Sequence, residues 1–438
     1  MTNTSPLPFL AEAPAIDGAP EWLALLRRSA VARYGQIGLP GPRTEAWKFT
    51  NLNALKALQP VPATGLGHIE RPDVFAGLDA TELHISNGAL SVFSGDVPPT
   101  GLEIVDLGDP DTVPAWVSET LGTVAAIDRH PFAALNTAAF IGGVAIRVTR
   151  GTMLEKPILL LADTQGGETQ GGEAATIAHP RVLVVVEEGA VADLVEVHTG
   201  AGSHVSNTVV EVTVGVGARL GHYKWQAEGV DAFHLAMTAV RAEAKATYDN
   251  FALSTGARLA RNEIRGELAG GHVDYRVNGA YMATGDQHLD TTTLIDHAVP
   301  DCHSQEIYKG VLAGRSRGVF QGKILVRPNA QKTDGYQMNR ALLLSRDAEI
   351  DSKPELEIYA DDVKCSHGAT VGALDDDQLF YLMARGIERE RARALLIGAY
   401  LDEAIATIER APVREAFRAV VDAWMQANVT GADTGGAP

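Results

Sequence analysis

The sequence contains little cysteine and comparatively little basic charge. Cys302 and Cys365 are the only cysteines in 438 residues, whereas small secreted proteins held together by disulfides contain many more. There are 37 basic residues against 55 acidic ones, a net charge of −18. Binding to nucleic acid depends on clustered Lys and Arg that displace phosphate counterions. The charge balance therefore argues against a nucleic-acid partner.

Long apolar runs and targeting signals are also absent. No run of about 18 apolar residues occurs, which excludes a membrane-spanning helix. Residues 1–17 have neither the basic start nor the apolar centre of a signal peptide. Together with the low cysteine content, these absences predict a cytoplasmic protein. The chain is 45% hydrophobic, which suffices for a sizeable core, and its length predicts two or three domains.

The common catalytic motifs are missing as well. No phosphate-binding loop is present, because the nearest segment, Gly318–Ile324, has the wrong spacing and no hydroxyl residue after its lysine. There is no Gly-x-Ser-x-Gly elbow of a serine hydrolase, and two cysteines cannot form paired zinc knuckles. We therefore expect no enzymatic activity, and any ATP must be bound by another chain.

The N-terminal third mixes helices and short strands. Glu21–Tyr34 has apolar residues at helical spacing, short strands follow over Thr81–Leu107, and a helical stretch over Thr112–Ala139 precedes a strand at Val144–Val148. This pattern divides the chain into an N-terminal helical region (1–80) and a core (81–372).

The middle of the chain, mainly 144–372, consists of short β-rich runs bounded by glycine. Some runs are continuously apolar, as in Val182–Val186, which is typical of parallel strands covered on both faces. Gly189-Ala190 and Gly217-Ala218 stand 28 residues apart, a step that favours a parallel β-helix, with a β-sandwich as the alternative. Asp163–His179 is rich in Gly, Glu and Thr and is expected to be a flexible excursion.

The pattern returns to helix over 373–428. Asp375, Asp376 and Asp377 suit a helix N-terminus. The apolar residues that follow offer more surface than three short helices can bury among themselves, which predicts a partner on this region. The residues expected to contact it are Leu395, Leu396, Ile405, Phe417, Val420 and Trp424. The last residues, 429–438, are polar and predicted to be disordered.

Cys365 and His367 form the most informative constellation. On a strand, residues two apart share a face, so a thiolate and an imidazole would lie together, with Asp361 and Asp362 just before them. This is half of a tetrahedral metal site, and the other ligands would have to come from another chain. The alternative from spacing alone is that Cys365 is a core residue and His367 stabilises a turn.

Six segments resemble the SufB/SufD family of the SUF iron–sulfur cluster assembly machinery. They are Arg43–Thr50, Pro131–Ala138, Glu306–Leu312, Gln331–Gln337, Ile350–Gly372 and Leu379–Ile387. The resemblance spans nearly the whole chain, and its SufD branch fits better than SufB, which is longer and richer in cysteine.

The resemblance implies a mainly β fold, a right-handed parallel β-helix flanked by N- and C-terminal helical regions. It implies a scaffold subunit that pairs with a SufB-like chain, binds the SufC-like ABC ATPase through its C-terminal helices and supports iron acquisition. No cofactor would be permanently bound; a transient Fe–S cluster would form at the contact with SufB. By its position in the Cys-Ser-His-Gly-Ala-Thr-Val-Gly motif, His367 would be a cluster ligand, with the role of Cys365 open.

Other interpretations remain at this stage. A β-helix carbohydrate-active enzyme would share the solenoid, although such enzymes are commonly exported. A SufB-like subunit of the same complex, or a homodimer of the isolated chain, would share the family motifs.

Overall fold

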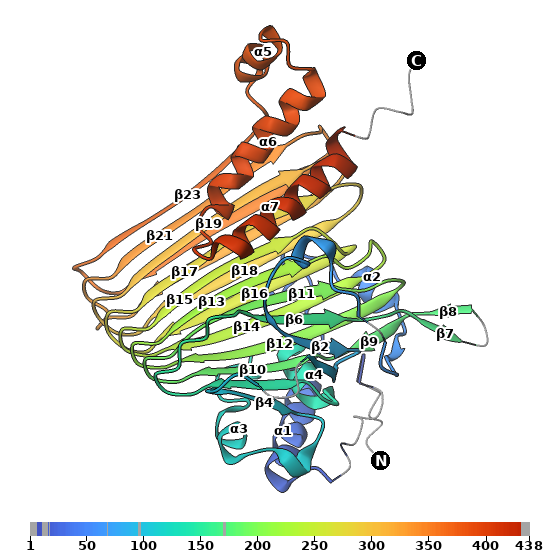
Figure 1. The fold of residues 1–438 in the computed structure, drawn as a ribbon, viewed down its shortest axis with the longest axis vertical. Helices are drawn as coiled ribbons and strands as arrows, with labels where there is room; N and C mark the ends of the chain where they lie inside the picture. The colour runs from blue at the N-terminus through green and yellow to red at the C-terminus, as the bar shows by residue number, and fades with distance from the viewer. Residues whose placement is uncertain are drawn as a thin grey trace.

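The middle of the chain forms a solenoid in which successive strands alternate between two parallel sheets (Figure 1). This is a computed structural model, and it describes residues 7–10, 16, 18–67, 69–94, 98–169 and 172–430. The 11-stranded sheet, called the even sheet below because most of its strands have even numbers, has the order β22-β20-β18-β16-β14-β12-β10-β5-β4, with β9 beside β12 and β1 beside β9. The 10-stranded sheet, the odd sheet, has the order β23-β21-β19-β17-β15-β13-β11-β6-β2-β3.

The strands of the even sheet are β1 (Val61–Pro62), β4 (Leu102–Asp106), β5 (Val144–Val148), β9 (Thr176–Ala178), β10 (Arg181–Val186), β12 (His204–Val214), β14 (Phe233–Ala242), β16 (Leu259–Leu268), β18 (His288–His297), β20 (Arg317–Val326) and β22 (Glu349–Ile358). Those of the odd sheet are β2 (Thr81–Ser86), β3 (Ala89–Ser94), β6 (Ile158–Asp163), β11 (Val191–Thr199), β13 (Arg219–Gln226), β15 (Thr247–Ser254), β17 (Asp274–Ala283), β19 (His303–Leu312), β21 (Asp334–Leu343) and β23 (Lys364–Gly372). The short strands β7 (Gly167–Thr169) and β8 (Gly172–Ala174) pair only with each other.

The predicted repeat is confirmed by the register. Val191 pairs with Arg219, and Arg219 with Thr247, each partner lying 28 positions further on. Gly189 and Gly217 begin these turns with φ of 67° and 62°, a left-handed conformation that glycine adopts at little cost. Because each strand pairs in parallel with its counterpart in the next turn, the fold is a parallel β-helix and the β-sandwich alternative is wrong.

Two local predictions need correction. The stretch Thr112–Ala139 is not one helix but α3 (Ala115–Thr120) and α4 (Pro131–Ala139). The segment between them is not helical, because the buried Glu211 carboxylate accepts hydrogen bonds from the backbone N–H groups of Gly122, Val124 and Ala125. The Asp163–His179 segment contains the β7–β8 hairpin and the buried strand β9, so it is not a loose excursion.

Most of the N-terminal region covers the outer face of the even sheet. It contains α1 (Glu21–Ile37), α2 (Asn53–Ala57) and the short helices η1 (Glu45–Trp47) and η2 (Asp73–Phe75), of which η2 packs beside α7 on the odd sheet. A further short helix, η3 (Pro110–Thr112), precedes α3 in the core. Trp47 lies 4.1 Å from the Arg261 guanidinium and 5.2 Å from the Phe132 ring. Arg261 is buried and paired with Asp290, so the Arg43–Thr50 segment seals a charged group that would otherwise face water.

Four helical elements follow the solenoid: α5 (Asp376–Ala384), α6 (Arg389–Ile405), α7 (Ala411–Met425) and the terminal turn η4 (Gln426–Thr430). Helices α6 and α7 lie across the opposite, odd sheet, whereas α5 projects beyond the end of the solenoid (Figure 1). The Asp375 carboxylate caps α5 by accepting from the N–H groups of Asp377 and Gln378, as its acidic start predicts. Val429 is buried against this helical layer, so the predicted tail does not begin there; 431–438 lie outside the described residues.

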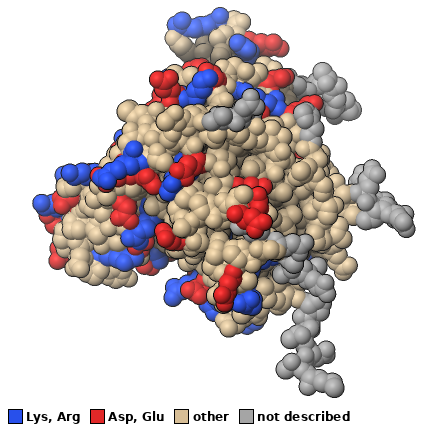
Figure 2. Space-filling model, turned by 60° about the horizontal axis from the view of Figure 1, so that its bottom comes forward, with Lys and Arg blue, Asp and Glu red and all other residues tan. Residues whose placement is uncertain are grey.

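On the face shown in Figure 2, basic and acidic side chains are interspersed among large uncharged areas. None of the helices in the described ranges combines the length and apolar character needed to cross a bilayer.

Candidate functional site

The solenoid ends at an uncovered edge of each sheet. Among the described residues, β23 pairs only with β21, and β22 only with β20. A strand at a sheet edge presents unpaired N–H and C=O groups that can pair with another chain. The last turn therefore offers two edges, and Cys365 and His367 lie on one of them.

The two edges differ in how they are protected. The β22 edge carries charged residues and a proline, which usually protect an edge strand against unwanted pairing. These residues are Lys353, Pro354, Glu355 and Glu357. On β23, Lys364 is the only charged residue, and no proline occurs. The β23 edge is thus the one whose sequence permits pairing.

Cys365 and His367 share the inward-facing side of β23, as strand periodicity predicts. A Cβ built on Gly335, the register partner of Cys365, would lie 3.5 Å from the Cys365 Sγ and also 3.5 Å from Ile324 Cδ1 inside the solenoid. Cys365 is half-buried, and burial raises the pKa of its thiol. His367 is exposed because no further turn covers it.

Among the residues that the structure describes, no third ligand completes that pair. Asp361 and Asp362 are exposed and lie in a bend before β23, off the strand face. Within the described ranges, three or more potential metal ligands come together only at His198, Glu228 and His234. Cys365 and His367 are therefore an incomplete set, although their role as ligands stays a prediction.

A buried polar ladder lies behind His367. Its register partner is Gln337, whose own partner is Glu306. Gln337 Nε2 donates to Glu306 Oε2 at 2.6 Å, and both side chains are fully buried. Burial raises the pKa of Glu306 to about 7. Sequence reasoning missed Glu306 and Gln337, because only the register reveals that they stand in one column with His367.

The Glu306 carboxyl should make stability depend on pH. The folded chain holds its proton up to about pH 7, whereas the unfolded chain releases it near pH 4–5. The free energy of unfolding should therefore fall as the pH rises from about 4.5 to 7. We expect Glu306→Gln to raise it by up to about 3 kcal/mol near pH 8 and to change it little near pH 5.

Urea unfolding at both pH values measures this effect. Glu415→Gln, at an exposed position, is the matched control and should leave both values unchanged. Equal stability changes for Glu306→Gln at the two pH values would show that the carboxyl does not titrate as described.

The predicted partner residues of the C-terminal helices need correction. Ile405, Phe417, Val420 and Trp424 are buried, with exposed fractions of 1%, 0%, 3% and 8%. They pack on the outer face of the odd sheet, where Phe417 meets Phe251 edge to face at 5.6 Å. The prediction compared the helices only with one another, and it missed the apolar sheet face that they cover.

The exposed apolar surface lies elsewhere on these helices. Leu395 is 43% exposed and Leu396 half-buried, while Phe380 and Tyr381 on α5 are 72% and 56% exposed. Beside them, residues of α6 and α7 line a groove of about 900 Å³. Of the predicted residues, only Leu395 and Leu396 thus keep exposed apolar area, and the more exposed Phe380 and Tyr381 lie on α5, which the prediction did not include.

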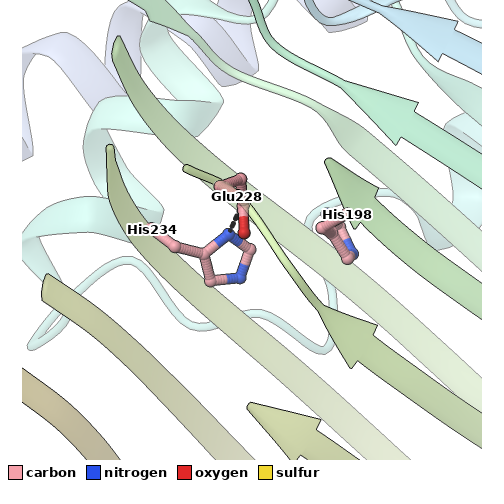
Figure 3. A group of neighbouring side chains, drawn as sticks. All are labelled: His198, Glu228 and His234. Atoms are coloured by element: carbon pink, nitrogen blue, oxygen red, sulfur yellow. Dashed lines mark hydrogen bonds and ion pairs between the residues drawn. The ribbon is translucent and has the colours of Figure 1, made fainter. Parts of the chain in front are cut away.

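A second polar cluster lies inside the solenoid (Figure 3). Glu196 contacts His198 and His222, and His234 contacts Glu228 and Lys224. Burial lowers the pKa of His234 to about 4. Burial opposes ionisation of Glu228, but the neighbouring His234, His198 and Gln226 together outweigh it and hold the carboxyl pKa at about 2. These residues come from different turns, so spacing in the sequence did not reveal them.

Comparisons with known proteins agree with this architecture. The family model described as "SUF system FeS cluster assembly, SufBD core domain" matches residues 168–400. The chain is 33% identical over 372 residues to the Escherichia coli iron–sulfur cluster assembly protein SufD, covering 84% of this chain and 85% of that protein.

Two further relatives extend the match. Protein ABCI7, chloroplastic, of Arabidopsis thaliana is 33% identical over 86% of this chain and 80% of its own length. A SufBD family protein of Synechocystis is 30% identical over 95% of this chain and 94% of its own. The carbohydrate-active alternative is therefore set aside, and the relatives named SufD favour that branch over SufB. The chain belongs to the SufB/SufD family, is of the SufD type, and is a subunit of the SUF iron–sulfur cluster assembly system.

Proposed function

We propose that this chain is a non-catalytic scaffold that pairs with a SufB-type chain at the open end of its solenoid and acts in the cytoplasm. The observation that carries this proposal is the unprotected β23 edge, with His367 exposed beside it. Strand addition at such an edge supplies main-chain hydrogen bonds. It also brings the partner's side chains next to His367, where they supply the missing ligands of a transient Fe–S cluster.

His367 is suited to this role because a neutral imidazole is a competent ligand for iron. Cys365 is less suited, because its thiol faces the interior and its pKa is raised by burial; the thiolate is the ligand form. The scaffold thus contributes the imidazole, and the half-buried Cys365 acts mainly in packing.

A SufC-type ATPase is proposed to bind the other exposed surface. Phe380, Tyr381 and Leu395 present apolar area on α5 and α6, next to the groove between α6 and α7. Aromatic side chains of this kind are enriched among the residues that dominate binding energy in protein interfaces. ATP hydrolysis then belongs to that partner.

Two variants should separate the two contacts in co-purification with both partners. Lys364 N–H donates toward β21, to Thr333 O. Because the N–H groups of a strand alternate between its edges, the Ala369 N–H faces the open edge. Ala369→Pro should remove that donor without breaking the β21 ladder, and so release the SufB-type chain while the ATPase stays bound. Phe380→Glu should do the reverse, weakening ATPase binding by about thirtyfold or more.

Matched controls keep the geometry of each position. Ala369→Ser retains the N–H and Phe380→Leu retains apolar area, so both should co-purify with both partners. Capture of the SufB-type chain by Ala369→Pro at the wild-type level would contradict pairing at β23. Loss of both partners in either variant would contradict two separate surfaces.

A further inference from the structure

The buried cluster in Figure 3 has the composition of a metal site. His198 lies near the end of β11, His234 near the start of β14, and Glu228 in the turn that precedes β14. One ligand atom from each lies within 4.8 Å of the others, and all three side chains are at most 3% exposed. We propose that these residues bind one divalent first-row transition-metal ion, of the Fe²⁺ or Zn²⁺ class.

The ligand types point to that class. Two imidazoles and one carboxylate are the set used by non-haem Fe²⁺ centres and by several Zn²⁺ sites. Harder ions such as Ca²⁺ and Mg²⁺ prefer oxygen ligands throughout. Glu228 and His234 are already in contact, with 2.5 Å between Oε1 and Nδ1. The ion would take the place of the proton that these two atoms share, and the displaced proton leaves to solvent.

The surroundings orient the first ligand. Glu196 Oε2 lies 3.0 Å from His198 Nε2, and its other oxygen lies 2.8 Å from His222 Nε2. His222 Nδ1 in turn lies 2.8 Å from the Tyr248 hydroxyl. A carboxylate that holds one imidazole nitrogen fixes the ring and directs the other nitrogen to the metal. Here that leaves His198 Nδ1 free for the ion.

The charges favour a cation. Glu196 and Glu228 are buried carboxylates, and Lys224 is a basic residue that contacts this cluster. Lys224 Nζ lies 3.0 Å from His234 Nε2, on the opposite side of the ring from Glu228. The ammonium also interacts with the Glu196 and Glu228 carboxylates, and one positive charge against two negative charges leaves a net negative charge for a cation to balance.

This site is separate from the cluster interface. In the odd sheet, β11 and β23 are separated by six strand spacings. At about 4.8 Å each, these spacings amount to roughly 30 Å. The inference concerns the isolated chain and does not depend on pairing with a partner.

Metal binding by the full-length chain tests the proposal. The starting protein is the double variant His367→Ala/Cys365→Ser, so that the exposed end of the solenoid contributes no ligands. Any bound metal is first removed from it with a chelator. Anaerobic titration with Fe²⁺, and with Co²⁺ read from its visible absorption, should show one ion per chain. Zn²⁺ should displace the Co²⁺. His198→Gln and Glu228→Gln should abolish binding, and Glu196→Gln should weaken it by about 10–100-fold.

His297→Gln is the control, because His297 is another buried imidazole of the solenoid but lies outside the cluster. It should bind Co²⁺ like its parent. Circular dichroism of the metal-free variants checks folding. If a ligand variant does not fold, the test is whether Glu196→Gln weakens metal binding relative to its parent. Absence of stoichiometric binding, or equal binding by His198→Gln and His297→Gln, would show a hydrogen-bonded network without metal. Partner capture does not enter this readout, so the proposed scaffold function stands or falls separately.

Discussion

Replacing His367 with Ala should lower Fe–S cluster formation by the assembled complex by at least about tenfold. The imidazole is exposed at the uncovered end of the solenoid, so its removal takes away the proposed cluster ligand without leaving a cavity in the core. The free energy of unfolding should therefore change by less than about 1 kcal/mol. Complex assembly should survive, because an interface depends on many contacts.

Cluster loading is measured by absorbance and iron and sulfide content in a complex of verified stoichiometry. Ser366→Ala, at the adjacent exposed position on the same strand, is the matched control and should load normally. Cys365→Ser should have a smaller effect than His367→Ala, because the Cys365 thiol faces Ile324. Normal loading by His367→Ala in an intact complex would leave His367 as a structural residue.

Phe417→Ala should produce the largest loss of stability, about 3–5 kcal/mol. The Phe417 ring is fully buried and meets Phe75 and Phe251 edge to face, at 6.1 and 5.6 Å. Its removal leaves a cavity between α7, the N-terminal region and the odd sheet, which should loosen the C-terminal helices first. Urea unfolding followed by circular dichroism measures the change.

Tyr381→Ala is the control for this experiment. Tyr381 is aromatic and on the same helical region but 56% exposed, so its replacement should change stability by less than about 0.5 kcal/mol. An unchanged unfolding free energy for Phe417→Ala would mean that α7 does not dock on the sheet of its own chain. The same packing explains why deleting the C-terminal helices is a poor test of partner binding, since it would expose the sheet beneath them.

Much of the fold followed from local sequence. The apolar run Val182–Val186 predicted a strand covered on both sides, and the Gly-Ala pairs predicted a turn every 28 residues. Both signals are local, because side-chain alternation and left-handed turns depend on neighbouring residues only. Asp375 marked a helix start for the same reason, through hydrogen bonds to residues two and three positions later.

Tertiary structure decided which apolar and polar residues are hidden. Phe417 and Trp424 had the helical spacing of a surface for a partner, but the odd sheet of the same chain covers them. The hydrophobic effect favours any burial of apolar area. Helical periodicity therefore shows that one face of a helix is covered, but it does not show whether the same chain or a partner covers it.

The sequence by itself determined the family, the strand repeat and the shared face of Cys365 and His367. Only the tertiary structure placed Glu306 and Gln337 in one column with His367, and brought His198, Glu228 and His234 within 4.8 Å. The physical reason is register. In a solenoid, residues about one turn apart become neighbours, but the turn here is 27 residues long from Thr247 to Asp274 and 31 from His303 to Asp334, so spacing in the sequence alone does not give the pairing.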